Sequence, residues 1–333
     1  MYSLDITLPK LGSKVYAMNL QNKLLFVMLT CLLTSAFVAT DANAKGERFI
    51  LISHAPDSDP WWNTIKNAVK EASERMDVSV LYRNPSTGDL ADMARIVEQA
   101  VASNPDGIIV TIADFDVLKN PLEKATKKGI PLVTINSGTH QQSQDLGALM
   151  HIGQPEYQAG FMAGEKAKQA GVKQFVCVNH YITNPSSVER CQGYADALGV
   201  TLGGNMLDSS QDPGHIEKKV QAYLRSHPAT DGILTLGPTS AIPVINLVNK
   251  MRLQTQVHFS TFDLSNEITS AISQGTIDFA IDQQPYLQGF MAVTILALNI
   301  RYGIVPSNDM YSGPAFITQK NVAQVESLAG TVR

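Results

Sequence analysis

The sequence is poor in cysteine and has no cluster of basic residues. Three cysteines occur among its 333 residues, and none forms a Cys-x-x-Cys pair. This excludes a scaffold held by several disulfides and a structural zinc site, because both need more cysteines than this. Lys and Arg number 26 against 30 Asp and Glu, which gives a net charge of −4 without any Lys/Arg-rich run. Nucleic-acid binding needs a positive surface, so we expect no DNA or RNA partner.

Motifs for catalysis and for metal or nucleotide binding are missing as well. The seven histidines show no HExxH or HxH spacing, and neither a GxSxG elbow nor a GxxxxGK[ST] loop occurs. Such motifs position a zinc ion, a nucleophilic serine or a phosphate group. We therefore predict no catalytic residue, no metal and no cofactor. A Ser/His/Asp set assembled from distant positions stays open, which keeps a secreted α/β hydrolase as an alternative.

The longest uncharged apolar run lies near the amino terminus. Residues 24–39 follow a lysine and precede Ala42-Asn43-Ala44, which is the layout of a secretory signal peptide with its small-residue cleavage site. We predict that residues 1–44 are a signal peptide cleaved after Ala44, with Met18 as a possible true start. The run is shorter than the ~20 residues of a membrane-spanning helix. An uncleaved membrane anchor is the alternative.

Export would place the two cysteines of the mature chain in an oxidising compartment, where disulfides persist. Cys177 ends a strand-like run and Cys191 lies early in the next expected helix, so the two could meet across one βα unit. Spacing does not fix the Cα separation that a disulfide requires. A disulfide and a pair of buried thiols are therefore both compatible with the sequence.

Short apolar runs alternate with amphipathic segments from Glu47 onward, which predicts an α/β fold. The spacing of Ile65, Ala68, Val69 and Ala72 indicates a helix with one buried face. Runs that are nearly continuous in apolar residues are typical of parallel strands covered on both faces. In the first half, these strand-like runs are Phe49–Ser53, Val78–Tyr82, Gly107–Thr111 and Pro131–Ile135.

The same alternation restarts after His151, so we predict two doubly wound α/β lobes. The long segment Gln284–Arg301 is almost wholly apolar in its second part, and we expect a buried core helix there because that part is too short to span a membrane. The further elements are strands Gln174–Val178, Gly232–Leu236, Val257–Phe262 and Ile277–Ile281, and helices near 156–170, 187–198, 215–226 and 241–251.

A polar loop with two tryptophans follows the first strand. Ligands of open α/β sheets bind beyond the carboxyl ends of the strands, and His54, Asp59, Trp61 and Trp62 all lie in this loop. A tryptophan face stacks on the apolar face of a sugar ring, while carboxylates hold its hydroxyls. We expect the loop to bind a ligand, with core packing as the alternative role of one tryptophan.

Other polar residues follow later strands or begin the helices after them. Buried polar groups are costly unless they are hydrogen-bonded, which makes these residues candidates for ligand binding. Each also has an ordinary alternative role, in a turn, in solvent or as the cap of a strand. His180 either lines the cleft or is buried in the core. The candidates are Asn136, Arg190, Asp212, Asp263 and Gln283.

Several blocks of the chain together resemble the type I periplasmic binding proteins of sugar ABC importers, the ribose-binding-protein-like family. The resemblance covers essentially the whole mature chain, in matching order and spacing. It implies two lobes joined by three crossovers that close on a monosaccharide like a hinged clamp. The blocks are Phe49–Ser53 with Asp59-Pro60-Trp61-Trp62, Pro105–Ile109, Gly129–Thr134, Glu189–Tyr194, Thr261–Asp263 and Asp282–Pro285.

The chain also departs from the family pattern at two strand ends. It has Asn136-Ser137 where many relatives have Asp-Arg, and Gly237-Pro238 where they have Asn-Asp. Without that carboxylate and guanidinium, ribose itself is not the expected ligand. Another pentose or hexose, a polyol or cyclitol, and a furanone-like signal molecule stay open. The residues that the resemblance matches to stacking and hydroxyl-binding positions are Trp61, Trp62, Arg190, Asp263 and Gln283.

The resemblance implies lobes built from separate segments, 46–151 with 284–313 and 152–283 with 314–333. The expected function is non-enzymatic: a monomeric periplasmic protein captures a sugar or polyol between its lobes and delivers it to an ABC permease in the inner membrane. A sensory receptor that presents its ligand to a histidine kinase or a chemoreceptor is the alternative within the binding class.

Overall fold

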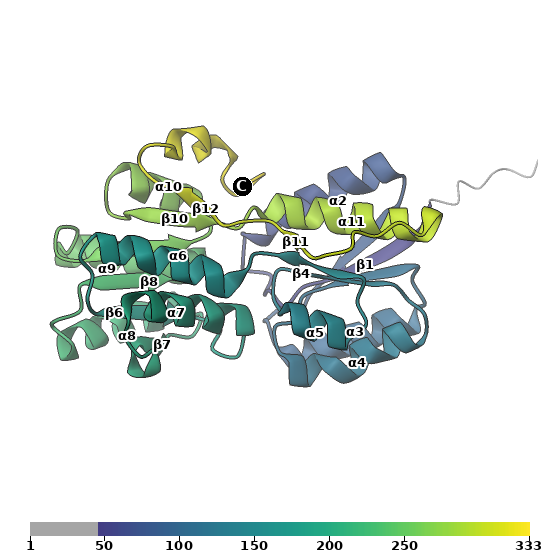
Figure 1. The fold of residues 1–333 in the computed structure, drawn as a ribbon, viewed down its shortest axis with the longest axis horizontal. Coiled ribbons are helices and arrows are strands. Elements are labelled where there is room, and N and C mark those ends of the chain that lie inside the picture. The colour runs from purple at the N-terminus through teal and green to yellow at the C-terminus, as the bar shows by residue number, and fades with distance from the viewer. Residues whose placement is uncertain (1–45) are drawn as a thin grey trace, which may run out of the picture. The chain divides into compact units, whose positions relative to one another are not determined.

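In the computed structural model the described residues are 46–333. The expected signal peptide, its cleavage site after Ala44 and the possible start at Met18 lie outside the described residues. Residues 46–333 form two sheets, each with helices on both faces (Figure 1). The structure therefore confirms the predicted fold of two doubly wound α/β lobes.

The amino-terminal lobe contains a parallel sheet with the strand order β11-β5-β4-β3-β1-β2. Helices α2 (Trp62–Met76) and α11 (Pro285–Tyr302) pack on one face, and α3 (Leu90–Ala102) and α4 (Phe115–Lys127) on the other. A short helix, α5, covers His140–Asp145. The strands are β1 (Arg48–Ile52), β2 (Ser79–Arg83), β3 (Gly107–Val110), β4 (Leu132–Ile135), β5 (Met150–Gly153) and β11 (Met310–Tyr311).

The carboxy-terminal lobe repeats this arrangement with the order β12-β10-β9-β8-β6-β7, in which only β12 is antiparallel to its neighbour. Helices α6 (Glu156–Gln169) and α7 (Pro185–Leu198) cover one face, and α8 (Pro213–Ser226), α9 (Pro238–Met251) and α10 (Asn266–Ser273) the other. Short 3-10 helices cover Gly203–Asn205, Val322–Gln324 and Glu326–Leu328. The strands are β6 (Phe175–Asn179), β7 (Met206–Asp208), β8 (Gly232–Thr235), β9 (His258–Phe262), β10 (Phe279–Asp282) and β12 (Ala315–Ile317).

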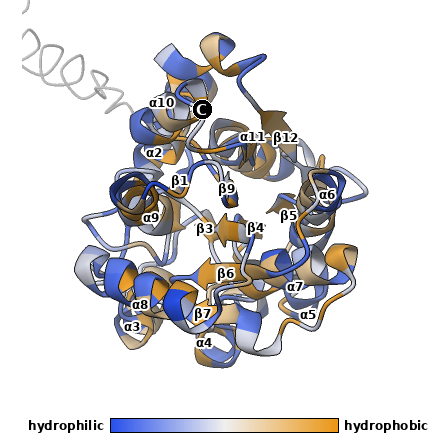
Figure 2. Ribbon diagram, turned by 90° about the vertical axis from the view of Figure 1, so that its left-hand side faces the viewer, coloured by the Kyte–Doolittle hydropathy of each residue, from blue (hydrophilic) through white to orange (hydrophobic). Residues whose placement is uncertain are grey.

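Each sheet has a hydrophobic core on either side, because successive strand residues face opposite ways. Phe49 and Leu51 of β1 pack with α2 and α11, whereas Ile50 and Ile52 pack with α3 and α4. Figure 2 shows hydrophobic strands inside and helices whose outer faces are hydrophilic. No helix within residues 46–333 is both long and apolar enough to cross a membrane. The apolar helix α11 packs into the core of its lobe instead.

The chain passes between the two sheets three times, at residues 153–156, 282–285 and 311–315. The first two passages follow β5 and β10, which occupy matching places in the two strand orders. Each passage then enters a long helix, α6 or α11. The two lobes are therefore joined by short connections of similar design.

Three helices of the carboxy-terminal lobe begin earlier than the sequence predicted. Helices α7, α8 and α9 start at Pro185, Pro213 and Pro238, two or three residues before the expected starts. Proline suits the first helical position, where its missing N–H would have no partner within the helix. The first turns of α7 and α9 consequently lie directly beyond the strands and line the cleft.

Candidate functional site

A pocket lies between the two lobes, beyond the carboxyl ends of their strands. Every predicted ligand-binding residue except Asp212 lines this pocket. Those residues are His54, Asp59, Trp61, Trp62, Asn136, Arg190, Asp263 and Gln283, and the additional lining residues are Ser137, His180, Tyr181, Asn184, Ser186, Ser187, Leu236, Gly237, Pro238 and Thr239.

Asp212 does not line the pocket. Its carboxylate accepts a hydrogen bond of 2.8 Å from the backbone N–H of His215 and caps α8, and its side chain is 61% exposed. An Asp directly before a first-turn proline is a helix start signal. The structure thus assigns Asp212 a capping role in place of the predicted ligand contact.

The amino-terminal lobe contributes an aromatic wall. The rings of Trp61 and Trp62 meet edge-on with centroids 5.2 Å apart, and His54 lies edge-on to Trp62 at 5.4 Å. Both tryptophans are almost fully buried and belong to the core between α2 and the sheet. They therefore pack in the core and also line the pocket. Asp59 accepts a hydrogen bond from the backbone N–H of Trp61, and burial raises the pKa of this carboxyl to about 6.

Two buried histidines face the pocket as uncharged groups. His54 Nδ1 lies 3.0 Å from Thr111 Oγ1, and burial lowers the pKa of His54 to about 4. Burial lowers the pKa of His180 to about 3, and its Nδ1 has no hydrogen-bond partner among the described residues. Both rings are therefore neutral at pH 7 and can donate or accept hydrogen bonds. Of the two roles left open for His180, the structure shows a place in the cleft.

A chain of hydrogen bonds joins two strand ends across the lobes. Asn136 follows β4 and Asp263 follows β9, with φ of 61° and 65°. Asn and Asp adopt this left-handed conformation more readily than other non-glycine residues. Asn136 Nδ2 donates to Gln283 Oε1 at 2.9 Å, and Gln283 Nε2 donates to Asp263 Oδ1 at 2.6 Å. Burial raises the pKa of Asp263 to about 7, against the opposing effects of Arg190 and Gln283.

Arg190 is paired with Glu156, a residue that the sequence analysis did not single out. Arg190 Nε and Nη2 donate to the two Glu156 oxygens at 2.6 and 2.7 Å, and Nη1 donates to the Leu236 carbonyl at 3.2 Å. The two side chains are 7% and 2% exposed. Burial disfavours the charge of Arg190, but Glu156 and Asp263 together outweigh this effect and raise the Arg190 pKa. The positive charge in the pocket thus has a counter-ion within the protein.

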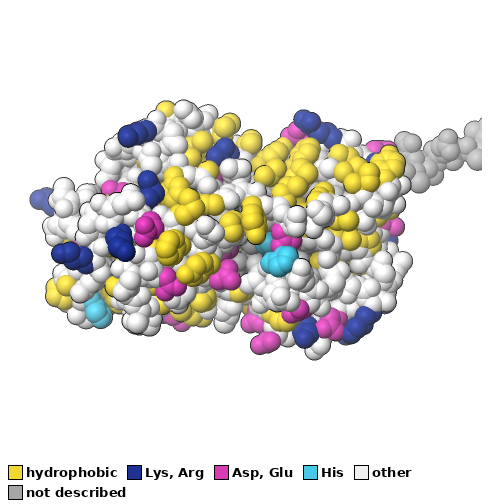
Figure 3. Space-filling model, viewed as in Figure 1, with side chains coloured by type: hydrophobic (Ala, Val, Ile, Leu, Met, Phe, Trp, Pro, Cys, Tyr) yellow, Lys and Arg dark blue, Asp and Glu magenta, His cyan; other side chains and the backbone are white. Residues whose placement is uncertain are grey.

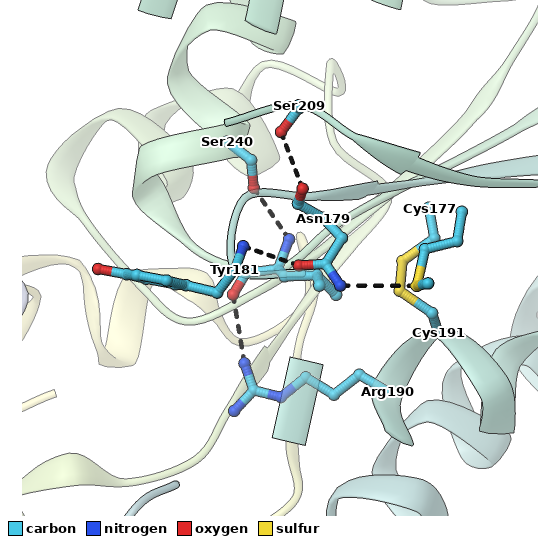
Figure 4. Close-up of a disulfide and its surroundings, with 9 residues drawn as sticks. Cys177, Asn179, Tyr181, Arg190, Cys191, Ser209 and Ser240 are labelled. Carbon is cyan, nitrogen blue, oxygen red and sulfur yellow. Dashed lines mark hydrogen bonds between the residues drawn. A yellow bond between two sulfur atoms is a disulfide. The ribbon is translucent and has the colours of Figure 1, made fainter. Parts of the chain in front are cut away.

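A disulfide lies directly behind Arg190. Cys177 of β6 and Cys191 of α7 are bonded, with Cα atoms 5.8 Å apart. Figure 4 shows this bridge beside Asn179, with Arg190 nearby. The Arg190 side chain donates to the carbonyl of Leu236. Because Cys191 follows Arg190 in the chain, the bridge ties the arginine-bearing turn of α7 to the sheet.

Direct hydrogen bonds join the two lobes at residues that line the pocket. Asn184 Nδ2 donates to Ser137 Oγ at 3.0 Å, and the backbone N–H of Gly138 donates to Ser186 Oγ at 3.3 Å. Tyr181 of one lobe also meets His54 of the other edge-on at 5.2 Å. The structure therefore holds the two lobes in a closed arrangement.

The pocket offers hydrogen-bonding groups rather than a catalytic constellation. Among residues 46–333, no group of three His, Cys, Asp or Glu side chains is placed to hold a metal ion. Across the same residues, no pocket serine is hydrogen-bonded to a histidine, as an activated nucleophile would be. Aromatic faces, neutral imidazoles, amides and carboxyls together suit a compact polyhydroxylated molecule.

Comparisons with known proteins agree with this geometry. Residues 49–303 match the sequence profile described as periplasmic binding protein domain. The xylose/arabinose-binding protein of Sulfolobus acidocaldarius is 24% identical over 291 residues, 83% of this chain and 72% of that protein. The ribose import binding protein of Bacillus subtilis is 21% identical over 274 residues, 80% of this chain and 87% of that protein. The structure of a carbohydrate transporter from Acidothermus cellulolyticus in complex with myo-inositol matches with a TM-score of 0.78 and 30% identity, covering 85% of this chain and 98% of that one.

Proposed function

Because the chain belongs to the periplasmic binding protein family, we propose that it captures a monosaccharide, or a related polyol or cyclitol, and delivers it to the permease of an ABC transporter. The observation that carries this proposal is one pocket with an aromatic wall from one lobe and a hydrogen-bonding wall from the other. A ring with an apolar face and a rim of hydroxyls is complementary to both walls.

Each wall has a distinct part in binding. Trp61 and Trp62 supply the apolar contact, while His54 and His180 supply neutral hydrogen-bonding atoms. Arg190 has five N–H donors, of which three make the hydrogen bonds to Glu156 and Leu236 described above. The remaining donors have no hydrogen-bond partner within residues 46–333 and can bind ligand hydroxyls. Binding to both walls at once favours the closed arrangement over an open one.

The relatives support the ligand class without fixing one compound. The two curated relatives are named as binding proteins for xylose/arabinose and for ribose. The structure at 30% identity contains myo-inositol. We therefore place cyclitols beside pentoses and hexoses as the first compounds to test.

A thermal-shift screen of the purified protein tests the proposal. A ligand that binds the folded state raises the melting temperature by mass action. We expect a shift with a sugar, polyol or cyclitol, and loss of that shift in Trp61→Ala. Tyr302→Ala is the matched control, because Tyr302 is 68% exposed and lies outside the pocket. A shift with amino acids only would contradict the ligand class.

We also propose that the protein is exported and processed, with cleavage after Ala44. The apolar run of residues 24–39 and the small residues that follow it support this proposal. Protein recovered from the periplasm should begin at Lys45. An amino terminus at Met1 or Met18 would contradict processing.

Delivery to a permease requires a surface to which both lobes contribute. Figure 3 shows exposed hydrophobic side chains over α6 of one lobe and over α11 of the other. Phe161 of α6 is 38% exposed and Tyr302, at the end of α11, is 68% exposed. Closure fixes the distance between such groups, so a permease that touches both lobes would recognise the closed form. Phe161→Asp should reduce ligand uptake by cells while leaving ligand affinity unchanged, and loss of both together would contradict this role.

A further inference from the structure

The pocket is lined by one basic side chain and two acidic ones. Arg190 is the one Lys or Arg among the described residues that line it, and Asp59 and Asp263 line it as well. Glu156 binds Arg190 with both carboxylate oxygens. Lys66 of α2 lowers the pKa of Asp59 but lies outside the lining, over the ring of Tyr82. The formal charge of Arg190, Glu156, Asp59 and Asp263 together is therefore negative.

The Glu156–Arg190 pair occupies a place that the other lobe fills with apolar residues. Residues 152–163 and 281–292 both begin with Ile and both end in Gly-Phe-Met-Ala, and each segment leads from a crossover into a long helix. Gly160 packs against the backbone of Arg190, and Gly289 packs against the backbone of Ile65.

This correspondence matches Arg190 to Ile65 and Glu156 to Pro285, and both of these apolar residues are buried. The fold therefore does not require an ion pair at this place. Buried ion pairs also contribute little net stability compared with apolar residues of similar size. A role in the pocket accounts better for this pair than a role in folding.

We propose that Glu156 sets the charge selectivity of the pocket: by neutralising Arg190, it makes the pocket accept ligands without negative charge and reject anionic analogues such as uronates and sugar phosphates. This inference rests on the proposed function and narrows its substrate class.

The geometry explains how rejection would work. A guanidinium binds a carboxylate or phosphate best through two parallel hydrogen bonds, which form a fork. The Nε and Nη2 donors of Arg190 form such a fork, and both are already bonded to Glu156. An anionic ligand would also meet Asp59 and Asp263. Burial raises the pKa of both carboxyls, and the same desolvation would penalise an anionic group on a ligand.

Helix N-termini at the pocket attract anions, but this attraction offsets the rejection only in part. Helices α2, α7 and α9 begin there, and a helix N-terminus carries roughly half a positive charge. Proline at the first position of α7 and α9 removes one N–H from each end. Each helix end therefore opposes the acidic side chains with a partial charge only.

Matched ligand pairs test the inference by calorimetric titration. The pairs are D-glucose with D-glucuronate, D-galactose with D-galacturonate, and myo-inositol with myo-inositol 1-phosphate. In the wild type, we expect the neutral member of any pair that binds to bind at least about tenfold more tightly. In Glu156→Gln, we expect the ratio to fall by about tenfold or more, because the Arg190 fork becomes available. Glu165→Gln is the control, since Glu165 lies on the same helix outside the pocket and should leave the ratio unchanged.

Each contrary result has a distinct meaning. Equal or tighter binding of an anionic member by the wild type overturns the inference and leaves the proposed function standing. An unchanged ratio in a folded Glu156→Gln variant overturns the role of Glu156. If no sugar, polyol or cyclitol binds in any form, the proposed function fails and the inference fails with it. The ratio of neutral to anionic affinity is measured on the wild type alone. The inference can therefore be tested even if Glu156→Gln misfolds.

Discussion

The two lobes place similar residues at matching positions of the same strand order. Because both lobes have this strand order, residues that agree between the lobes are features of the shared fold, and residues that differ are specific to one lobe. At the matching strand ends the pairs are His54 with His180 after β1 and β6, Asn136 with Asp263 after β4 and β9, and Gln154 with Gln283 after β5 and β10.

The differences between the lobes concern charge and aromatic surface. Where α2 presents Trp61 and Trp62 to the pocket, α7 presents Ser186 and Ser187. Arg190 on α7 stands where α2 has an apolar residue. One lobe therefore supplies the aromatic surface, and the other supplies the ion pair of Arg190 with Glu156. Exchanging residues between matching positions can test this division.

The largest effect should follow from breaking the ion pair on one side only. Arg190→Ile copies the residue of the other lobe but leaves the buried Glu156 carboxylate without its counter-ion, with only the hydrogen bond from Gln154 Nε2, which should cost about 3–5 kcal/mol of unfolding free energy. Glu156→Leu combined with Arg190→Ile should recover most of that loss. Urea denaturation measures the free energy of unfolding of both variants. Equal losses in the single and double variants would show that the pair itself stabilises the lobe.

Asp263→Asn makes the strand end of β9 like that of β4. The Asp263 pKa is about 7 in the folded protein against an ordinary 3.8, so between these pH values the folded state holds a proton that the unfolded state has lost. Wild-type stability from this group therefore falls as pH rises from about 4 to 7, by up to about 4 kcal/mol.

The amide that Asp263→Asn introduces does not titrate, so the stability of this variant relative to the wild type should increase over this pH range. His54 and His180 titrate with the opposite sign in both proteins, and their contributions cancel in the difference. Melting curves of both proteins between pH 4 and 8 measure this difference in stability. A difference that does not change with pH would contradict the raised pKa.

Removing the disulfide should weaken only the carboxy-terminal lobe. Cys177→Ser with Cys191→Ser opens a loop with a sequence separation of 14, for which chain entropy gives about 3 kcal/mol. Hydrogen exchange should become faster in β6 and α7 while β1 and α2 keep their protection. Equal loss of protection in both lobes would mean that they unfold as one unit.

The smallest effect concerns the contact between the lobes. Ser137→Ala removes the acceptor of Asn184, and one such hydrogen bond contributes about 0.5–1.5 kcal/mol. Ligand affinity should fall by up to about tenfold because the closed arrangement is less favoured. Ser143→Ala removes a hydrogen bond to Thr134 within one lobe and serves as the control. If the control lowers the affinity equally, the effect does not come from closure.

Local patterns in the sequence were sufficient to predict most strands and most of the pocket. Buried parallel strands are short apolar runs, and ligand groups follow their carboxyl ends. Four strands were not predicted. β7, β11 and β12 lie at sheet edges and are only partly buried, whereas β5 is buried but has the polar residue His151 among its four residues. Asp212 was misassigned because the same residue type serves helix caps and ligand sites, and only the proline after it favoured the cap.

The partner of Arg190 could not be found from local patterns. Glu156 lies 34 residues away, at the start of another helix, and only tertiary packing brings the two together. A signal was nevertheless present, since residues 152–163 and 281–292 are similar. They differ at five positions, and Glu156, which matches Pro285, is the one charged residue of the first segment. Comparing the two halves of the chain would have drawn attention to this residue.

Calorimetric titration with the sugar, polyol or cyclitol that gives the largest thermal shift, followed by mass measurement of the recovered ligand, decides whether the pocket binds such a molecule without converting it. We expect one ligand molecule per chain and recovery of the ligand unchanged, with affinity lost in Trp61→Ala. Failure of every neutral polyhydroxylated compound to bind, or recovery of a chemically altered ligand, would contradict a binding function for this pocket.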